Sequence, residues 1–209
     1  MPSSFAAQSP ADVVNLAVAR LGYKLRVGSL YDGSAVAKKA LDVYAQTRDV
    51  LLRDADYAWP FAERNVVATL LKSSPVGGYI PPNQWNPVNN PPLPYLYEYA
   101  FPSDCLEVRA VKPQTFFLPN FDPQPNLFAI VNDNGFTPPQ RVIVCNVGGA
   151  ILTYVGQITD PNTFPPDFTE ALAASLARRL APFIGGPEAL KVEAADEQMS
   201  DAMAEAKQA

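Results

Sequence analysis

Three carboxylic residues lie close together in the sequence beside two large aromatic residues. Asp54, Asp56 and Glu63 flank Trp59 and Phe61. Glycosidases cleave glycans with a pair of carboxyl groups, one acting as an acid and the other as a base or nucleophile. These residue types are therefore compatible with a carboxylate-dependent hydrolase of cell-wall glycan. The simpler interpretation is a solvated helix end beside aromatic core residues, because only geometry identifies such a site.

Most other catalytic chemistry is excluded by composition, because the chain contains no histidine. A nucleophilic site that uses a histidine base cannot be built, and two cysteines alone cannot complete a zinc site. The glycine pairs Gly77-Gly78, Gly148-Gly149 and Gly185-Gly186 lack the lysine and the strand-to-helix context of a phosphate-binding loop. We therefore expect no cofactor, no metal and no enzymatic activity.

The bulk properties indicate a folded protein with much surface to be covered. The chain has 209 residues, of which 48% are hydrophobic, only 18% are charged and 22 are proline. The net charge of −5 argues against tight binding of nucleic acid, and residues 187–209, with six acidic and two basic residues, carry −4 of it. No apolar run is long enough for a membrane span, and no secretion signal is present, so we expect no membrane association.

The hydrophobic pattern predicts helices at both ends of the sequence. Residues 9–22 and 32–59 have apolar residues at helical spacing, with Pro60 as the expected stop of the second helix. Arg48 lies within the apolar seam of that helix, so if buried it must find a carboxylate or a carbonyl. The expected seams are Val13, Leu16, Ala17 and Leu21; Ala37, Leu41, Tyr44, Leu51 and Ala55; and, after Pro165-Pro166, Phe168, Leu172, Leu176, Leu180 and Phe183.

The middle of the chain has the composition of short strands. β-Branched and aromatic runs are bounded by proline, glycine or asparagine at residues 66–71, 95–101, 105–111, 127–131, 141–147 and 150–155. We expect residues 102–104 to turn the second run into the third, and Gly148-Gly149 to form a tight hairpin turn between the last two. Cys105 and Cys145 lie in such runs and are expected to be buried free thiols, with a disulfide as the alternative.

These elements predict an α+β protein in which a helical bundle, built from both chain ends, carries an inserted antiparallel β module and long proline-rich loops. The expected parts are a helical part (1–64), the β module (65–158) with loops 73–94 and 113–126, a second helical part (159–186) and an acidic C-terminal helix (187–209).

The two loops are candidate interface segments. Residues 73–94 hold seven prolines and no charged residue, and both loops contain large aromatic side chains. Proline limits the entropy that a loop loses on docking. The candidate interface residues are Arg48, Tyr79, Trp85, Phe116, Phe117, Phe121, Arg178 and Arg179, together with Met199 and Met203 of the last helix.

Four blocks of the sequence together resemble the head-to-tail adaptor family of podoviruses, also called the tail tubular protein A family. None of the blocks is a catalytic motif, and it is their joint occurrence in family order that carries the resemblance. They are residues 14–30, with Arg20-Leu21-Gly22 and Val27-Gly28-Ser29-Leu30; residues 40–62, ending in Trp59-Pro60-Phe61-Ala62; residues 97–106, with Phe101-Pro102-Ser103-Asp104; and residues 152–177, with Pro165-Pro166-Asp167-Phe168.

The resemblance implies a structural protein of the bacteriophage virion. Such an adaptor forms a twelve-fold connector ring between the portal protein and the tail nozzle, a protein like tail tubular protein B. The ring would be assembled in the host cytoplasm, and DNA would pass through it at genome ejection without specific binding. Two other functions stay open at this point: the tail-associated glycan hydrolase, and a carbohydrate- or peptide-binding β module carried by helices.

Overall fold

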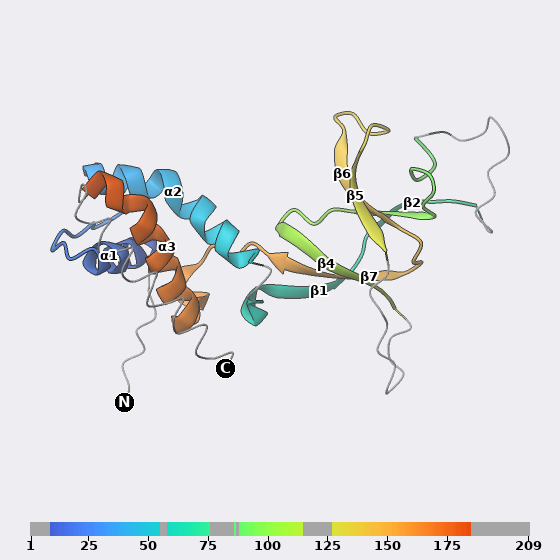
Figure 1. Cartoon of the computed structure of the whole chain (residues 1–209). Helices are drawn as coiled ribbons and strands as arrows, with labels where there is room; N and C mark the ends of the chain where they lie inside the picture. Colours follow the sequence, from blue (N-terminus) through green and yellow to red (C-terminus); the bar gives the residue numbers. More distant parts are fainter. Residues whose placement is uncertain (1–8, 55–57, 76–85, 87, 115–126, 185–209) are drawn as a thin grey trace, which may run out of the picture. The chain divides into compact units, whose positions relative to one another are not determined.

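The computed structural model describes residues 9–54, 58–75, 86, 88–114 and 127–184 (Figure 1). This part of the chain contains three α-helices and two antiparallel sheets, which confirms the α+β class. The chain divides into two compact units. One combines Met1–Phe61 with Ile158–Ala209, and the other is Ala62–Gln157. None of the described helices is long and apolar enough to cross a bilayer.

The first helix, α1 (Pro10–Arg20), has a cap at each end. The Ser9 side chain accepts a hydrogen bond from the backbone N–H of Asp12, as a serine at the N-cap does. Gly22 follows the helix with a φ of 79°, a left-handed conformation that glycine adopts without steric cost. The predicted helix is confirmed, although Leu16 lies outside its buried face, which holds Val13, Val14, Ala17 and Val18 instead.

The second helix, α2 (Ala35–Leu52), ends earlier than predicted. We expected Pro60 to stop it, but Arg53 already caps it. The indole Nε1 of Trp59 donates a hydrogen bond to the carbonyl of Leu51, 3.0 Å away, and so satisfies one of the last carbonyls of the helix. The helix predicted to run to residue 59 therefore ends at Leu52, with the Trp59 side chain bonded to its last turn.

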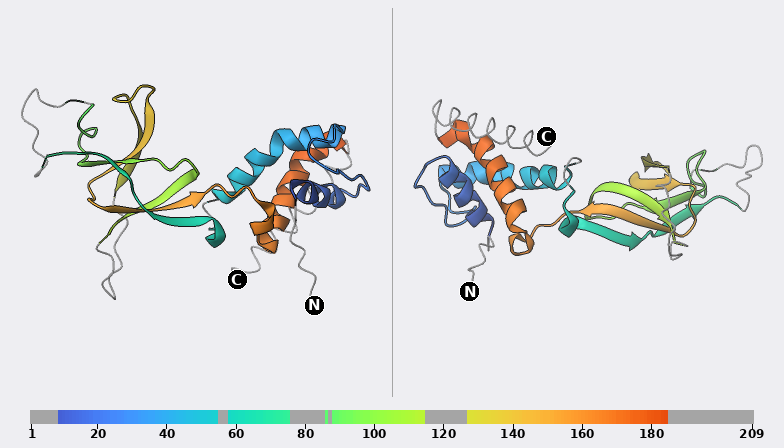
Figure 2. Two further views of the ribbon diagram at one scale, coloured as in Figure 1. Left: turned by 180° about the vertical axis from the view of Figure 1, so that it is seen from behind. Right: turned by 60° about the horizontal axis from the view of Figure 1, so that its bottom comes forward.

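The buried face of α2 matches the predicted seam in part. Ala37 and Tyr44 are buried as predicted, and Ala40 and Leu52 are buried beside them. Leu41 is exposed and Leu51 is half-buried, whereas Ala55 lies outside the described residues. The third helix, α3 (Pro166–Ile184), packs against both α1 and α2, and the small Ala40 allows close approach. Figures 1 and 2 show these three helices side by side.

The predicted seam of α3 is right at four of its five positions. Phe168, Leu172, Leu176 and Leu180 are fully buried, whereas Phe183 is 60% exposed. Phe183 lies beyond the last buried turn, and the Lys39 ammonium group lies 4.9 Å from the centre of its ring. The aromatic side chains of Trp59, Phe61, Phe164 and Phe168 pack edge to face around the start of the helix.

The second unit holds seven strands in two sheets. The three-stranded sheet has the order β1-β7-β4, and the four-stranded sheet has the order β2-β3-β6-β5. All neighbouring strands are antiparallel. The strands are β1 (Glu63–Val67), β2 (Leu70–Ser73), β3 (Tyr97–Ala100), β4 (Cys105–Pro113), β5 (Phe128–Asp133), β6 (Gln140–Cys145) and β7 (Ala150–Gly156).

The strand positions were predicted well, but their pairing was not. The run at 66–71 is two strands, β1 and β2, which belong to different sheets. The residues 102–104 and Gly148-Gly149 do form turns, but each connects strands of different sheets, so the hairpin predicted at Gly148-Gly149 is wrong. The β5–β6 pair, by contrast, is a hairpin and rises across the three-stranded sheet in Figure 1.

The core of the second unit lies between the two sheets. Tyr99, Ile143 and Cys145 of the four-stranded sheet face Val111 and Leu152 of the other. The Tyr99 hydroxyl donates a hydrogen bond to the Val147 carbonyl at 2.7 Å and accepts one from the Ala150 amide at 3.4 Å. Cys105 and Cys145 are buried free thiols, as expected, and the disulfide alternative is wrong.

Candidate functional site

A groove of about 460 Å³ lies between α2 and α3 in the helical unit. Arg178 and Arg179 of α3 line one side of it, and Val50 of α2, which is 45% exposed, lines the other. Arg179 also donates a hydrogen bond to the Gln46 side chain at 3.4 Å. The other lining residues are Thr47, Leu51, Asp54 and Ser175. Two guanidinium groups and one carboxylate thus line the groove beside two apolar side chains, and this excess of positive charge suits a segment that carries a carboxylate next to an apolar side chain.

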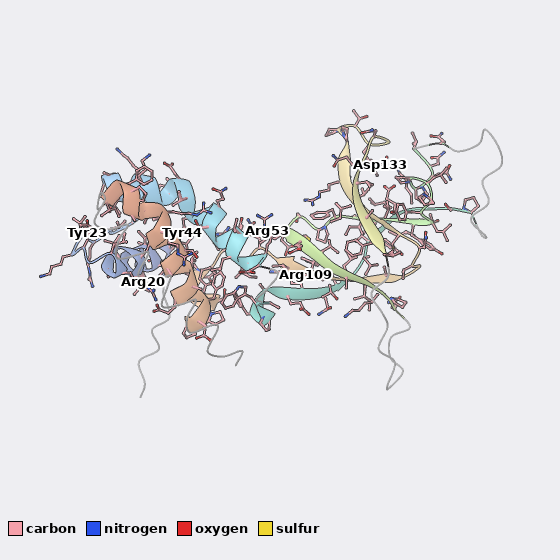
Figure 3. All side chains as sticks on the ribbon, viewed as in Figure 1. Arg20, Tyr23, Tyr44, Arg53, Arg109 and Asp133 are labelled. Atoms are coloured by element: carbon pink, nitrogen blue, oxygen red, sulfur yellow. The ribbon has the colours of Figure 1, made fainter. Side chains whose placement is uncertain are left out.

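Arg48 lies on α2, which forms one side of this groove, but its side chain is buried and does not line the groove. Its guanidinium group binds the Asp49 carboxylate through Nε at 2.8 Å and through Nη2 at 2.7 Å. The predicted carboxylate partner is therefore present, on the adjacent residue. One turn earlier lies Tyr44, labelled in Figure 3, whose burial raises the pKa of its phenol to about 12 against the opposing effect of the Arg48 charge.

The strand β1 forms an exposed edge in the other unit. It pairs with β7 on one side and is the outermost strand of its sheet, and all five of its residues are exposed. Val67 is 63% exposed and Val66 also reaches the surface. An edge strand presents unpaired backbone N–H and C=O groups that can pair with a further strand. The unpaired edge and the exposed valines together make β1 a candidate surface for a protein partner.

Three charged side chains are buried together on the four-stranded sheet. Lys72 on β2 is 8% exposed, Glu98 on β3 is fully buried and Asp133 at the end of β5 is 4% exposed. The Lys72 ammonium group contacts the Asp133 carboxylate and lies 3.6 Å from Glu98 Oε1. Figure 3 labels Asp133 on the β5–β6 hairpin. The ring of Phe136, in the turn of that hairpin, has its centre 4.6 Å from Lys72 Nζ.

The two carboxyl groups of this cluster differ in their environment. Burial raises the pKa of Glu98 to about 7, partly opposed by the Lys72 charge. The Asp133 carboxylate accepts hydrogen bonds from Lys72 and from the Gly135 amide, at 2.8 Å for the latter. Although burial alone would raise its pKa, these bonds together hold the pKa of Asp133 below its usual value. Asp133 is thus the anionic partner of Lys72, whereas Glu98 is poised to be protonated.

Neither a family model nor a curated protein matches this chain.

The predicted carboxylate site gains no support from the described residues. Asp54 lies just after α2 in the helical unit, Glu63 begins β1 in the other unit, and Asp56 lies outside the described residues. Trp59 and Phe61 belong to the aromatic cluster around Phe168. Within the described ranges no group of three or more acidic or cysteine side chains is placed to hold a metal ion.

Of the predicted interface residues, the structure brings Arg178 and Arg179 together in the groove and places Arg48 separately in the helical core. The remaining candidates lie outside the described residues: Tyr79, Trp85, Phe116, Phe117, Phe121, Met199 and Met203.

The Lys72–Glu98–Asp133 cluster was missed at the level of sequence. A charged residue inside an apolar strand run indicates such a cluster, and both Leu70-Leu71-Lys72 and Tyr97-Glu98-Tyr99 have that pattern.

Proposed function

We propose that this chain is a structural subunit of a phage virion that forms the adaptor ring between the portal protein and the tail nozzle. The observation that carries the proposal is β1, an edge strand exposed along its whole length with two valines on it. An exposed edge with apolar side chains can pair with another chain unless a partner covers it. In a ring, the neighbouring copy covers it in every subunit.

A closed ring needs two different surfaces on each copy, because its contacts are head to tail. The chain has one candidate on each unit: the β1 edge, and the groove between α2 and α3 with its two arginines. The two surfaces differ in chemistry, one offering backbone hydrogen bonds and valines and the other offering positive charge. This difference favours a heterologous contact over a symmetric pair.

The finer architecture of the proposal is a helical bundle formed from both chain ends, with the β module as an insert. Packing of α3 against α1 and α2, and the ion pair between Arg20 of α1 and Glu170 of α3, support it. Such an arrangement would let the helical unit and the β unit contact different partners, the portal on one side and the nozzle on the other.

An acidic subunit also suits the passage of DNA. The chain carries a net charge of −5, so a ring of these subunits would lack the clustered positive charge that binds phosphates. DNA could then pass through at ejection without being held.

The test is to mix the purified chain with its cognate portal protein and to measure association by sedimentation. The expected result is a complex that contains both proteins, weakened in the double variant Arg178→Ala, Arg179→Ala. Lys24→Ala serves as a matched control because it removes an exposed charge outside the groove. Portal and chain that sediment separately would refute the proposal.

A further inference from the structure

The buried cluster lies on one face of the four-stranded sheet. Lys72 and Glu98 are partners across the β2–β3 pair, and partners in an antiparallel pair share a face. Glu98 is opposite Val144 on β6, which is opposite Ala129 on β5. Asp133 lies four residues after Ala129, and side chains alternate along a strand, so Asp133 is on this face as well. The cluster therefore connects β2 and β5, the two outer strands of the sheet.

A simple ion pair accounts for only two members of the cluster. Lys72 and Asp133 satisfy each other, whereas the fully buried Glu98 makes only a longer contact with Lys72 and neither of its oxygens has a partner within hydrogen-bond distance. A buried polar group without such a partner is destabilising, so an ion pair alone does not explain this carboxyl group. The position of Glu98, 3.6 Å from Lys72 Nζ, instead suits a group that exchanges protons with the pair.

We propose that Lys72 and Asp133 form an intramolecular isopeptide bond, with Glu98 carrying protons between them. In this reaction the Lys72 ammonium group first passes a proton to the Asp133 carboxylate, and Nζ then attacks Cγ of Asp133 as the neutral amine. The new C–N bond replaces one C–O bond of the carboxyl group, and the released oxygen leaves as water. Glu98 gives a proton to the departing oxygen and takes one from the nitrogen, so it ends unchanged. No oxidant, reductant or cofactor takes part.

The surroundings favour this condensation over the ion pair. The amine and the carboxyl group are held in contact, which replaces an encounter in solution with a step inside one molecule. Charged groups are costly to bury, whereas the amide is neutral. The ring of Phe136 lies over Lys72 and adds to the apolar enclosure of the nitrogen. Burial raises the pKa of Glu98 to about 7, which supports the same reaction, because near neutral pH a protonated carboxyl group is then available to donate to the leaving oxygen.

The bond would join the two outer strands of the sheet covalently. It would close a loop between residues 72 and 133, and a cross-link of this kind stabilises mainly by restricting the unfolded chain. Unlike a disulfide, an amide resists reducing conditions. This inference does not depend on the adaptor function, since it concerns the β unit alone.

Intact-mass spectrometry of the full chain, denatured after purification, tests the proposal. The expected wild-type mass is lower than the sequence mass by one water molecule, and a protease digest should contain a branched peptide that joins the segments with Lys72 and Asp133. Lys72→Arg and Asp133→Ala should both restore the full mass. Lys39→Arg, which keeps an exposed charge on α2, is the control and should retain the water loss.

The variant Glu98→Gln tests the proton carrier, because glutamine keeps the size of the side chain. We expect most of its molecules to have the full mass. A wild-type chain at the full sequence mass would overturn the bond, whether or not the variants fold. A complete water loss in Glu98→Gln would overturn the role of Glu98.

Discussion

Lys72 Nζ lies 3.6 Å from Glu98 Oε1 across the β2–β3 pair, and both side chains are buried. Asp133, from β5, supplies a second carboxyl group to the same ammonium. One cation and two carboxyl groups are electrically neutral only when one carboxyl group holds a proton. Because burial raises the pKa of Glu98, the proton lies on Glu98, and the folding stability should therefore depend on pH.

The stability of the β unit should decrease as the pH rises through neutrality. The pKa of Glu98 is raised from 4.5 to about 7, so the folded chain binds a proton that the unfolded chain has already released. The stabilising contribution is therefore complete below pH 4.5 and is lost as the pH rises through about 7. The stability should also decrease with rising pH if Lys72 is bonded to Asp133, because the loss of the ammonium charge raises the pKa of Glu98 further.

Urea denaturation at a series of pH values measures this dependence. The difference in unfolding free energy between the wild type and Glu98→Gln should change over the same pH range, since glutamine does not titrate there. A constant difference would contradict the proposed protonation of Glu98.

The hydroxyl group of Tyr99 should contribute to the stability of the β unit. It bonds the Val147 carbonyl and the Ala150 amide, on either side of the turn between β6 and β7. Tyr99→Phe leaves the Ala150 amide without this partner and leaves the Val147 carbonyl with only the weaker bond from the Cys145 thiol at 3.7 Å, so it should lower the unfolding free energy by about 1–3 kcal/mol. Tyr31→Phe is the matched control, because Tyr31 is 81% exposed, and should change the stability by less than about 0.5 kcal/mol. Equal stability of Tyr99→Phe and the control would refute this assignment.

The exposed edge of β1 should be needed for assembly but not for folding. Val67→Asp places a charge where the adaptor proposal puts a subunit contact, and an unpaired buried charge costs well over 1.4 kcal/mol. Ring assembly should therefore be weakened about tenfold or more, measured by sedimentation, while the thermal unfolding temperature stays unchanged. Asn134→Asp adds the same charge at an exposed turn and should assemble normally. Normal assembly of Val67→Asp would exclude this edge from the interface.

The acidic C-terminal segment should bind a partner. Its expected stripe of alanine and methionine includes Met199 and Met203 and offers little area for burial within a single chain. Deletion of residues 187–209 should spare folding, measured by circular dichroism, and abolish portal binding. A deletion variant that fails to fold would show that the segment belongs to the core instead.

Local patterns predicted the elements of this protein better than its contacts. The stripe from Phe168 to Leu180 is buried as expected, because a helix that packs on two neighbours must bury one continuous face. The end of α2 was missed because it depends on Trp59, eight residues beyond Leu51, and no local period encodes that hydrogen bond.

Sheet membership was missed for the same physical reason. Alternation within a strand reports its two faces but not its partner strand, so the pattern predicts one run at residues 66–71 where the structure has two strands, β1 and β2. In the candidate site, the sequence identified Arg178 and Arg179 but not the groove that joins them to Val50. The cluster of Lys72, Glu98 and Asp133 depends on pairing between strands that are distant in the sequence, which is the relationship that a single sequence encodes least directly.

Electron microscopy of the chain assembled with its cognate portal protein tests the adaptor proposal most directly. We expect a closed ring of this chain bound to the portal, in which the β1 edge of each copy is covered by the next copy. A chain that stays monomeric beside the portal, or a ring in which β1 remains exposed to solvent, would contradict it.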